Sequence, residues 1–139
     1  IVFHNAPVPS GCTIESAAGA GPQLLPEDTS VAEGFVDYDN GELIRDAIGS
    51  MQPNARSAVG LNDAGEVYLI MIAQDNNSSG LTLAGLADFA ATLGVTKLLN
   101  LDGGSSSSIR FTDGHTHFGR LDADGNPIQR PVKSVLLSN

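Results

Sequence analysis

An amide and a carboxylate stand at the end of an apolar stretch within the segment Lys97–Ser108. Side chains alternate between the two faces of a β-strand, so Asn100 and Asp102 point to one face while Leu99 and Leu101 point to the other. We therefore expect the face with Asn100 and Asp102 to carry chemistry and the leucine face to lie in the core.

Two glycines and a run of serines follow this strand. Gly103 and Gly104 allow backbone conformations that are closed to other residues, and they let a ligand approach the main chain. Ser105 and Ser106 begin the serine run and supply amide and hydroxyl donors of the kind that hold anions. The sequence thus predicts an anion-binding loop, and the alternative is a polar turn that only ends the strand.

A second strand-like segment, residues 56–62, carries polar side chains at both ends. Alternation places Arg56 and Asn62 on one face with only small residues between them, which predicts a hollow there. If both strands share a sheet, Arg56, Asn62, Asn100 and Asp102 project from the same side. A guanidinium can hold a phosphate, an amide can orient a hydroxyl, and a carboxylate can transfer a proton or attack. The alternative is a structural ion pair between Arg56 and Asp102.

The elements that position these residues follow from the apolar periodicity. Residues 56–62 and 66–73 are joined by a short glycine-containing loop, which predicts a hairpin. Thr82 precedes apolar residues at helical spacing and Gly94 follows them, which predicts a capped helix. Residues 95–101 then form the next strand, so a right-handed crossover should return the chain to the same sheet.

The remaining segments are shorter and less regular. We expect short strands and turns in residues 1–25, a polar excursion with one short helix or strand in residues 27–54, and a last strand in residues 130–137. Together these elements predict one α+β (mixed α/β) domain over residues 1–139. Its twisted mixed sheet of about five to seven strands would carry a hairpin, one crossover helix and a glycine-rich loop after a central strand.

Composition excludes several classes of partner. The 139 residues include 16 acidic and 7 basic side chains, a formal charge of -9 without a basic cluster, so we expect no nucleic acid partner. No apolar run approaches the roughly 20 residues that cross a bilayer, so we expect no membrane span. The chain begins at Ile1 without a basic or long apolar stretch, and we expect a mature or trimmed product.

Two short motifs are typical of metal sites, and in both cases we favour another interpretation. His115 and His117 have a spacing that can chelate zinc, but no third ligand lies near them in the sequence, so we expect exposed hairpin histidines. Residues 122–126 resemble the start of a calcium loop without its closing glutamate, which favours a plain turn. We therefore expect no metal and no other cofactor.

Five motifs in order, Gly21-Pro22, Arg56–Gly60, Gly80–Leu83, Leu99–Ser105 and Arg130–Val132, resemble the phosphodiester glycosidase family. The combination of Asn-Leu-Asp-Gly-Gly with the upstream Arg-Ser-Ala-Val-Gly is the strongest part of the resemblance. It covers roughly the whole chain from residue 16 to residue 137 and corresponds to the later part of the family domain, with an upstream portion missing.

The resemblance implies a hydrolase that cleaves the glycosidic bond of a sugar-phosphate diester. Under that hypothesis Arg56 and the loop Gly103-Gly104-Ser105 hold the phosphate, Asn100 orients a sugar hydroxyl, and Asp102 is the catalytic carboxylate. Such enzymes normally use a second carboxylate, for which we prefer Asp75 to Asp63 and Glu66. The complete predicted site is Asp102, Asp75 and Asn100 as catalytic residues, and Arg56, Asn62, Gly103, Gly104, Ser105, Ser106 and Arg130 as substrate-binding residues. The family resemblance also implies an extracellular or exported protein.

Departures from the family pattern support a second hypothesis. Ser57 stands where the family often has threonine, Ser106 where a third glycine is common, and residues 74–77 where a Gly-Arg pair is frequent. The missing upstream portion would leave strand edges unpaired, and a second copy or a partner chain would cover them. The alternative is therefore a noncatalytic, self-associating structural or carbohydrate-binding module.

Overall fold

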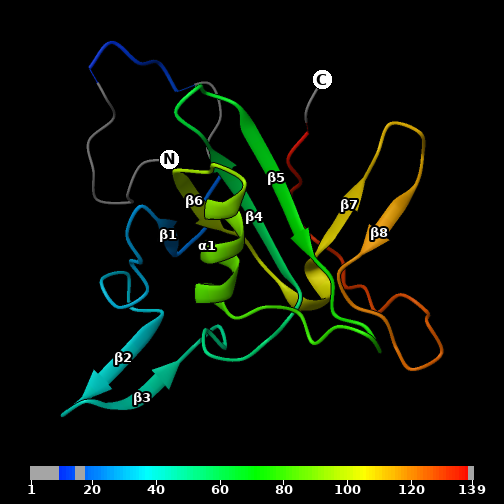
Figure 1. The fold of residues 1–139 in the computed structure, drawn as a ribbon, viewed down its shortest axis with the longest axis horizontal. Coiled ribbons are helices and arrows are strands. Elements are labelled where there is room, and N and C mark those ends of the chain that lie inside the picture. Colours follow the sequence, from blue (N-terminus) through cyan, green and yellow to red (C-terminus); the bar gives the residue numbers. More distant parts are fainter. Residues whose placement is uncertain (1–9, 15–17, 138–139) are drawn as a thin grey trace.

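A four-stranded antiparallel sheet with one helix on it forms the centre of the molecule (Figure 1). The computed structural model describes residues 10–14 and 18–137. The sheet order is β1 (Gln23–Leu25), β6 (Lys97–Asn100), β4 (Arg56–Leu61) and β5 (Val67–Ile72), with α1 (Leu83–Thr92) against it. Outside the sheet lie two hairpins and a short 3-10 helix: β2 (Val36–Asp39) with β3 (Glu42–Asp46), β7 (Ser108–Arg110) with β8 (Thr116–Phe118), and η1 (Gly104–Ser106).

The predicted hairpin is confirmed as β4 and β5, which pair in unbroken register from Arg56 with Ile72 to Leu61 with Val67. The loop closes through a hydrogen bond from the Asn62 amide to the Glu66 carbonyl at 3.2 Å. Gly65 has φ +81°, the left-handed conformation that glycine adopts without steric cost. The turn chemistry of the sequence was therefore sufficient to locate this hairpin.

The capped helix is also confirmed. The Thr82 hydroxyl accepts a hydrogen bond from the Gly85 amide at 3.0 Å, and Gly94, just after the C-terminal end, has φ +81°. β5 and β6 are both antiparallel to β4 and lie on either side of it, so they run parallel to each other. The chain thus returns through α1 to the same sheet, as the sequence predicted.

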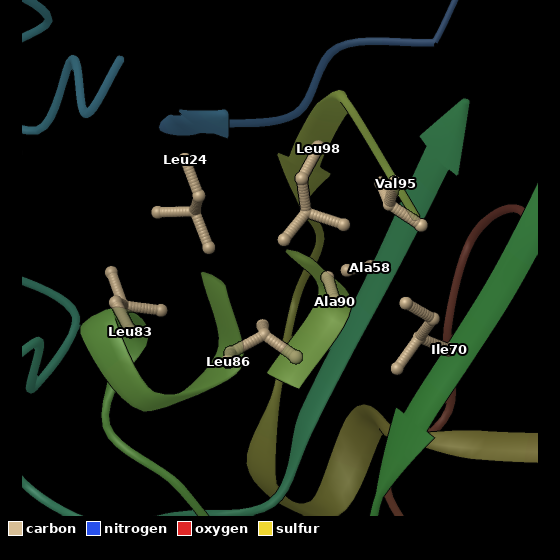
Figure 2. Close-up of a cluster of buried hydrophobic side chains, with 8 residues drawn as sticks. All are labelled: Leu24, Ala58, Ile70, Leu83, Leu86, Ala90, Val95 and Leu98. Atoms are coloured by element: carbon tan, nitrogen blue, oxygen red, sulfur yellow. The ribbon is translucent and has the colours of Figure 1, made fainter. Parts of the chain in front are cut away.

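The core lies between α1 and the facing side of the sheet (Figure 2). Leu83, Leu86 and Ala90 of the helix pack against Leu98 and Ala58 of the sheet. Each of these five residues is at most 2% exposed. Val95, Leu24 and Ile70 complete the cluster of buried side chains.

The predicted hollow over β4 is wrong, because this packing fills it. A Cβ atom built on Gly60 would lie 2.7 Å from Cγ1 of Val95 and 3.3 Å from Cδ1 of Leu98. Small residues on this face admit neighbouring apolar side chains instead of a ligand. The assignment of the leucines is corrected as well: Leu98 is fully buried beside Asn100, whereas Leu99 and Leu101 on the opposite face are half-buried.

Three further expectations need correction. All neighbouring strand pairs among the described residues are antiparallel, so the sheet is not mixed, and it has four strands instead of five to seven. Residues 130–137 form no strand, since no sheet edge pairs with their backbone, and the apolar Leu137 is 86% exposed.

The excursion in residues 27–54 holds the β2–β3 hairpin, which confirms its short strand. Of residues 1–25, β1 is confirmed, while residues 1–9 and 15–17 lie outside the described part.

The β2–β3 and β7–β8 hairpins project on opposite sides of the central sheet (Figure 1). Residues 101–107, including η1, connect β6 to β7 and therefore lead the chain away from the sheet. In the part of the chain that the structure describes, no helix has the length and apolarity needed to cross a membrane.

Candidate active site

Asp102, Ser106 and Arg130 come together beside the glycine-rich loop. Nη2 of Arg130 lies 2.5 Å from Oδ2 of Asp102, and Nε of Arg130 donates to the Ser106 hydroxyl at 2.6 Å. The backbone amide of Arg130 also donates to the Ser105 carbonyl at 3.0 Å. Three contacts from one loop therefore hold an arginine that follows Asp102 by 28 positions.

This cluster is open to solvent. The side chains of Arg130 and Asp102 are 60% and 63% exposed, so a ligand can reach both without a movement of the core. The described residues give Nη1 of Arg130 no hydrogen-bond partner, which leaves a donor for a ligand. Exposure also means that the ion pair itself adds at most about 1 kcal/mol to stability.

Asp102 is held in its ionised form. Partial burial alone would raise the pKa of its carboxyl group. Hydrogen bonds from Ser106 and Arg130, the charge of Arg130 and the Gly103 amide outweigh burial and lower the pKa below its ordinary value. A carboxylate with a lowered pKa is suited to act as a base or nucleophile, and it is a poor proton donor near neutral pH.

The glycine loop uses most of its own amides. The Gly104 amide donates to the Ala55 carbonyl at 2.8 Å, the Ser106 amide donates to the Gly103 carbonyl, and the Ser107 amide to the Gly104 carbonyl. A Cβ on Gly103 would lie 2.8 Å from the Ala55 carbonyl oxygen, so close packing requires this glycine. Gly104 has φ +60°, which favours glycine as well.

The Gly103 amide acts on the neighbouring Asp102 carboxylate, and the Ser105 backbone amide finds no partner among the described residues. The predicted cradle of several free amides is therefore reduced to this donor and the hydroxyl groups. Ser107 is buried, and its hydroxyl is hydrogen-bonded to that of Ser57 at 2.9 Å. Ser106, as described, is held by Arg130.

Arg56 occupies a different environment from the one its spacing suggested. The residue is 3% exposed, and its guanidinium donates to four backbone carbonyl oxygens, those of Leu81, Ile48, Gly49 and Gln52, at 2.6 to 3.1 Å. Burial lowers the pKa of Arg56 and the negative charge of Asp46 opposes that effect. This guanidinium ties the segment before β4 and the start of α1 to the sheet, and neither an ion pair nor a hydrogen bond joins it to Asp102.

Asn100 is the least accessible of the predicted catalytic residues. It is 4% exposed, and Nδ2 donates to the Gly21 carbonyl at 3.1 Å. Its Oδ1 is buried and has no partner among the described residues. The amide thus links β6 to the segment before β1 and keeps one acceptor free.

Asn62 and Asp75 lie elsewhere in the fold. The start of β4 is the end nearer Asp102, and Asn62 lies just after the other end, about 20 Å away along this strand of six residues. The Asn62 side chain closes the hairpin loop with Glu66. Oδ1 of Asp75 accepts from the amides of Asn77 and Ser78 in a turn after β5. No contact in the described residues joins either side chain to Asp102.

The motifs considered for metals form ordinary turns. Nδ1 of His115 lies 3.0 Å from Oδ2 of Asp113, and both side chains are well exposed. The Asp122 carboxylate accepts from the amides of Asp124 and Asn126 within its own turn. Residues 10–14 and 18–137 contain no group of three or more His, Cys, Asp or Glu side chains arranged to hold a metal ion.

An open apolar trough of about 850 Å³ runs along the free edge of β5. Leu69 of β5, Phe89 of α1, Leu93 just after α1 and Phe111 beside β7 line it with exposed apolar side chains, and Asp75 also lines it. Unpaired strand edges were expected from the missing upstream portion of the family domain, but the contribution of the helix and of the β7–β8 hairpin to this surface depends on the tertiary structure.

Sequence analysis placed Asp102, Ser106 and Arg130 in one site but did not predict that they contact one another. The alternation of side chains carries information along one strand only, and Arg130 lies in an irregular segment. The signal for Arg130 in the sequence was the motif Arg130–Val132, which resembles the closing segment of the family.

Comparisons with known proteins bear on this site. No curated protein matches the sequence. A crystal structure of a hypothetical protein from Synechocystis is 26% identical over 68% of this chain and 17% of that chain, with a TM-score of 0.40. The family model described as phosphodiester glycosidase matches residues 2–138. Because that match spans nearly the whole sequence, the chain belongs to the phosphodiester glycosidase family.

Proposed function

We propose that this chain hydrolyses the glycosidic bond of a sugar-phosphate diester, with Asp102 as the catalytic carboxylate and Arg130 as the phosphate-binding cation. The observation that supports this assignment is the ion pair of Asp102 with Arg130 at the edge of the glycine loop, in a member of the phosphodiester glycosidase family. Arg130 takes the role that the sequence suggested for Arg56, because the donors of Arg56 are used by backbone carbonyl oxygens.

The reaction follows from the charges of this site. Nη1 and Nη2 of Arg130, with the Ser105 amide, bind the phosphate oxygens of the diester. The bond between the anomeric carbon and the phosphate oxygen breaks, and its electron pair leaves on the phosphate monoester. Water supplies the new hydroxyl group at the anomeric carbon, and its proton is taken up by Asp102 and released to solvent. Asp102 must be ionised for this step, in accordance with its lowered pKa.

The other predicted residues take smaller parts in the proposal. A phosphate leaving group departs as a stable anion, so the need for a general acid is reduced, and the proposal assigns no role to Asp75, whose side chain makes no contact with Asp102 among the described residues. Because Oδ1 of Asn100 is buried, the proposed role of Asn100 is to hold the end of β6 in place through its hydrogen bond to the Gly21 carbonyl. The proposed substrate is a sugar phosphodiester or a glycan that carries one.

Hydrolysis of UDP-N-acetylglucosamine or of a simple sugar phosphodiester tests the proposal. We expect the chain to release free sugar and a phosphate monoester, and Asp102→Asn to abolish release while the fold is retained, since this side chain is exposed. Asp124→Asn is the matched control, because Asp124 is an exposed carboxylate in a turn outside the cluster. Full turnover by Asp102→Asn would remove Asp102 from the mechanism.

A second candidate function is a noncatalytic module that associates with a second copy of itself. The trough along β5 favours it, because a free strand edge flanked by exposed apolar side chains is a surface for strand pairing. Size-exclusion chromatography separates the two functions when it is combined with the hydrolysis assay. An inert oligomer whose assembly is lost in Leu69→Lys supports the module, whereas a monomer that turns over the diester supports the enzyme.

A further inference from the structure

Ser106 lies between the two charged groups of the site. Its hydroxyl oxygen accepts the hydrogen bond from Nε of Arg130 at 2.6 Å, which leaves its own proton for the Asp102 carboxylate, whose pKa it lowers. The same guanidinium reaches Asp102 through Nη2 at 2.5 Å. A hydroxyl group that binds Nε of the guanidinium fixes the direction in which Nη1 and Nη2 point.

The local backbone fixes the place of this hydroxyl group. Ser106 is the last residue of η1, and its amide donates to the Gly103 carbonyl at 3.1 Å. Arg130 is attached to the neighbouring Ser105 carbonyl through its backbone amide. Because both ends of the contact between Ser106 and Arg130 are held by one short loop, the hydroxyl group has little freedom to turn toward a substrate.

The other groups acting on Asp102 are few. Arg130 is the one charged group in the described residues that faces its carboxylate, and the Gly103 amide is the one backbone donor from the loop. The Ser106 hydroxyl also contributes to the lowering of the Asp102 pKa. Ser106 thus binds Arg130 directly and favours the ionised form of Asp102, whereas the sequence pattern placed it among the donors that hold the substrate phosphate.

We infer that Ser106 is a positioning residue, which aligns the Arg130 guanidinium with Asp102 and does not itself bind the phosphate. This inference rests on the proposed function and assigns separate roles within it. Arg130 and the Ser105 amide bind the phosphate, Asp102 acts on the water, and Ser106 keeps Arg130 aligned with Asp102. A residue with this role affects the protonation of Asp102 more than the affinity for substrate.

The test compares Ser106→Ala and Ser106→Thr with Ser108→Ala as the control, since Ser108 is an exposed serine of the same run whose side chain has no hydrogen bond within residues 10–14 and 18–137. Carbon-13 NMR titration of the Asp102 carboxyl group, with the exchange rate of the Arg130 Nε proton, reports on positioning without any substrate. For Ser106→Ala we expect a higher Asp102 pKa and faster exchange of the Nε proton. We expect Ser106→Thr, which keeps the hydroxyl group, to restore both values and Ser108→Ala to leave them unchanged.

Kinetics with a sugar phosphodiester provide the second readout. We expect Ser106→Ala to lower kcat about three- to tenfold, the effect of one lost hydrogen bond, with the acid limb of the pH profile moved upward and KM little changed. A raised KM with an unmoved pH profile and an unmoved Asp102 pKa would make Ser106 a phosphate ligand and overturn the inference. If the unmodified chain does not turn over any diester, the proposed function fails, and the NMR titration still decides the role of Ser106.

Discussion

Replacement of Arg56 separates the role that the sequence suggested from the one that the structure gives. In Arg56→Met the side chain keeps its length and loses every donor. The carbonyl oxygens of Ile48 and Gln52 then have no partner among the described residues, whereas those of Gly49 and Leu81 retain backbone donors. We therefore expect a measurable loss of stability and no specific loss of catalysis.

The magnitude follows from the two orphaned carbonyl groups. A buried polar group left without a partner costs about 1–3 kcal/mol; Ile48 is half-buried, whereas Gln52 is exposed and water can replace the guanidinium there, so Arg56→Met should lower the free energy of unfolding by about 1–3 kcal/mol. For a chain of this size a change of 1 kcal/mol shifts Tm by about 3–4 °C, and the expected fall in Tm is roughly 3–12 °C. Because total stabilities are about 5–15 kcal/mol, Arg56→Lys, which keeps some donors, serves as the milder variant.

The assay is thermal unfolding followed by circular dichroism, together with hydrolysis measured below the lowered Tm. We expect both Arg56 variants to unfold earlier and to keep the kcat/KM of the unmodified chain per folded molecule. Arg130→Lys should show the reverse pattern, an unchanged Tm with a loss of turnover, because its side chain is exposed and binds Asp102. An Arg56 variant with an unchanged Tm and no turnover would refute the reasoning and return the phosphate-binding role to Arg56.

Three further predictions concern the packing, the helix cap and the charge of the site. Gly60→Ala should lower the free energy of unfolding by about 1–3 kcal/mol in urea titration, because the added Cβ lies 2.7 Å from Val95 and the core must shift; a neutral result would mean that the core there is loose. Thr82→Ala should cost about 1 kcal/mol in the same titration, since it removes the N-cap acceptor of α1; an unchanged midpoint would contradict the cap. Arg130→Gln should raise the Asp102 pKa, because it removes a donor and a positive charge that favour the carboxylate. Activity that needs this carboxylate is lost as pH falls through its pKa, so the acid limb of the pH profile should move to higher pH. An unmoved acid limb would mean that Asp102 is not the group that titrates.

Local sequence chemistry predicted the elements whose stability depends on near neighbours. The β4–β5 hairpin and α1 were located because a turn loop, a capping threonine and a terminal glycine act within a few residues of one another. The strand expected in residues 130–137 has a similar apolar pattern, yet it finds no sheet edge among the described residues. A strand pattern in the sequence does not supply the neighbouring edge that a strand needs.

By itself the sequence determined the family, the positions of the hairpin and the helix, and the residue types available for chemistry beside the glycine loop. Only the tertiary structure decided which arginine meets Asp102. The face of β4 that holds Arg56 is covered by the crossover helix and its neighbours, so that guanidinium binds carbonyl oxygens, while an irregular segment brings Arg130 to the loop from 28 positions away. The physical reason is that the alternation of side chains along a strand determines which residues share a face, whereas packing between distant segments decides what covers that face.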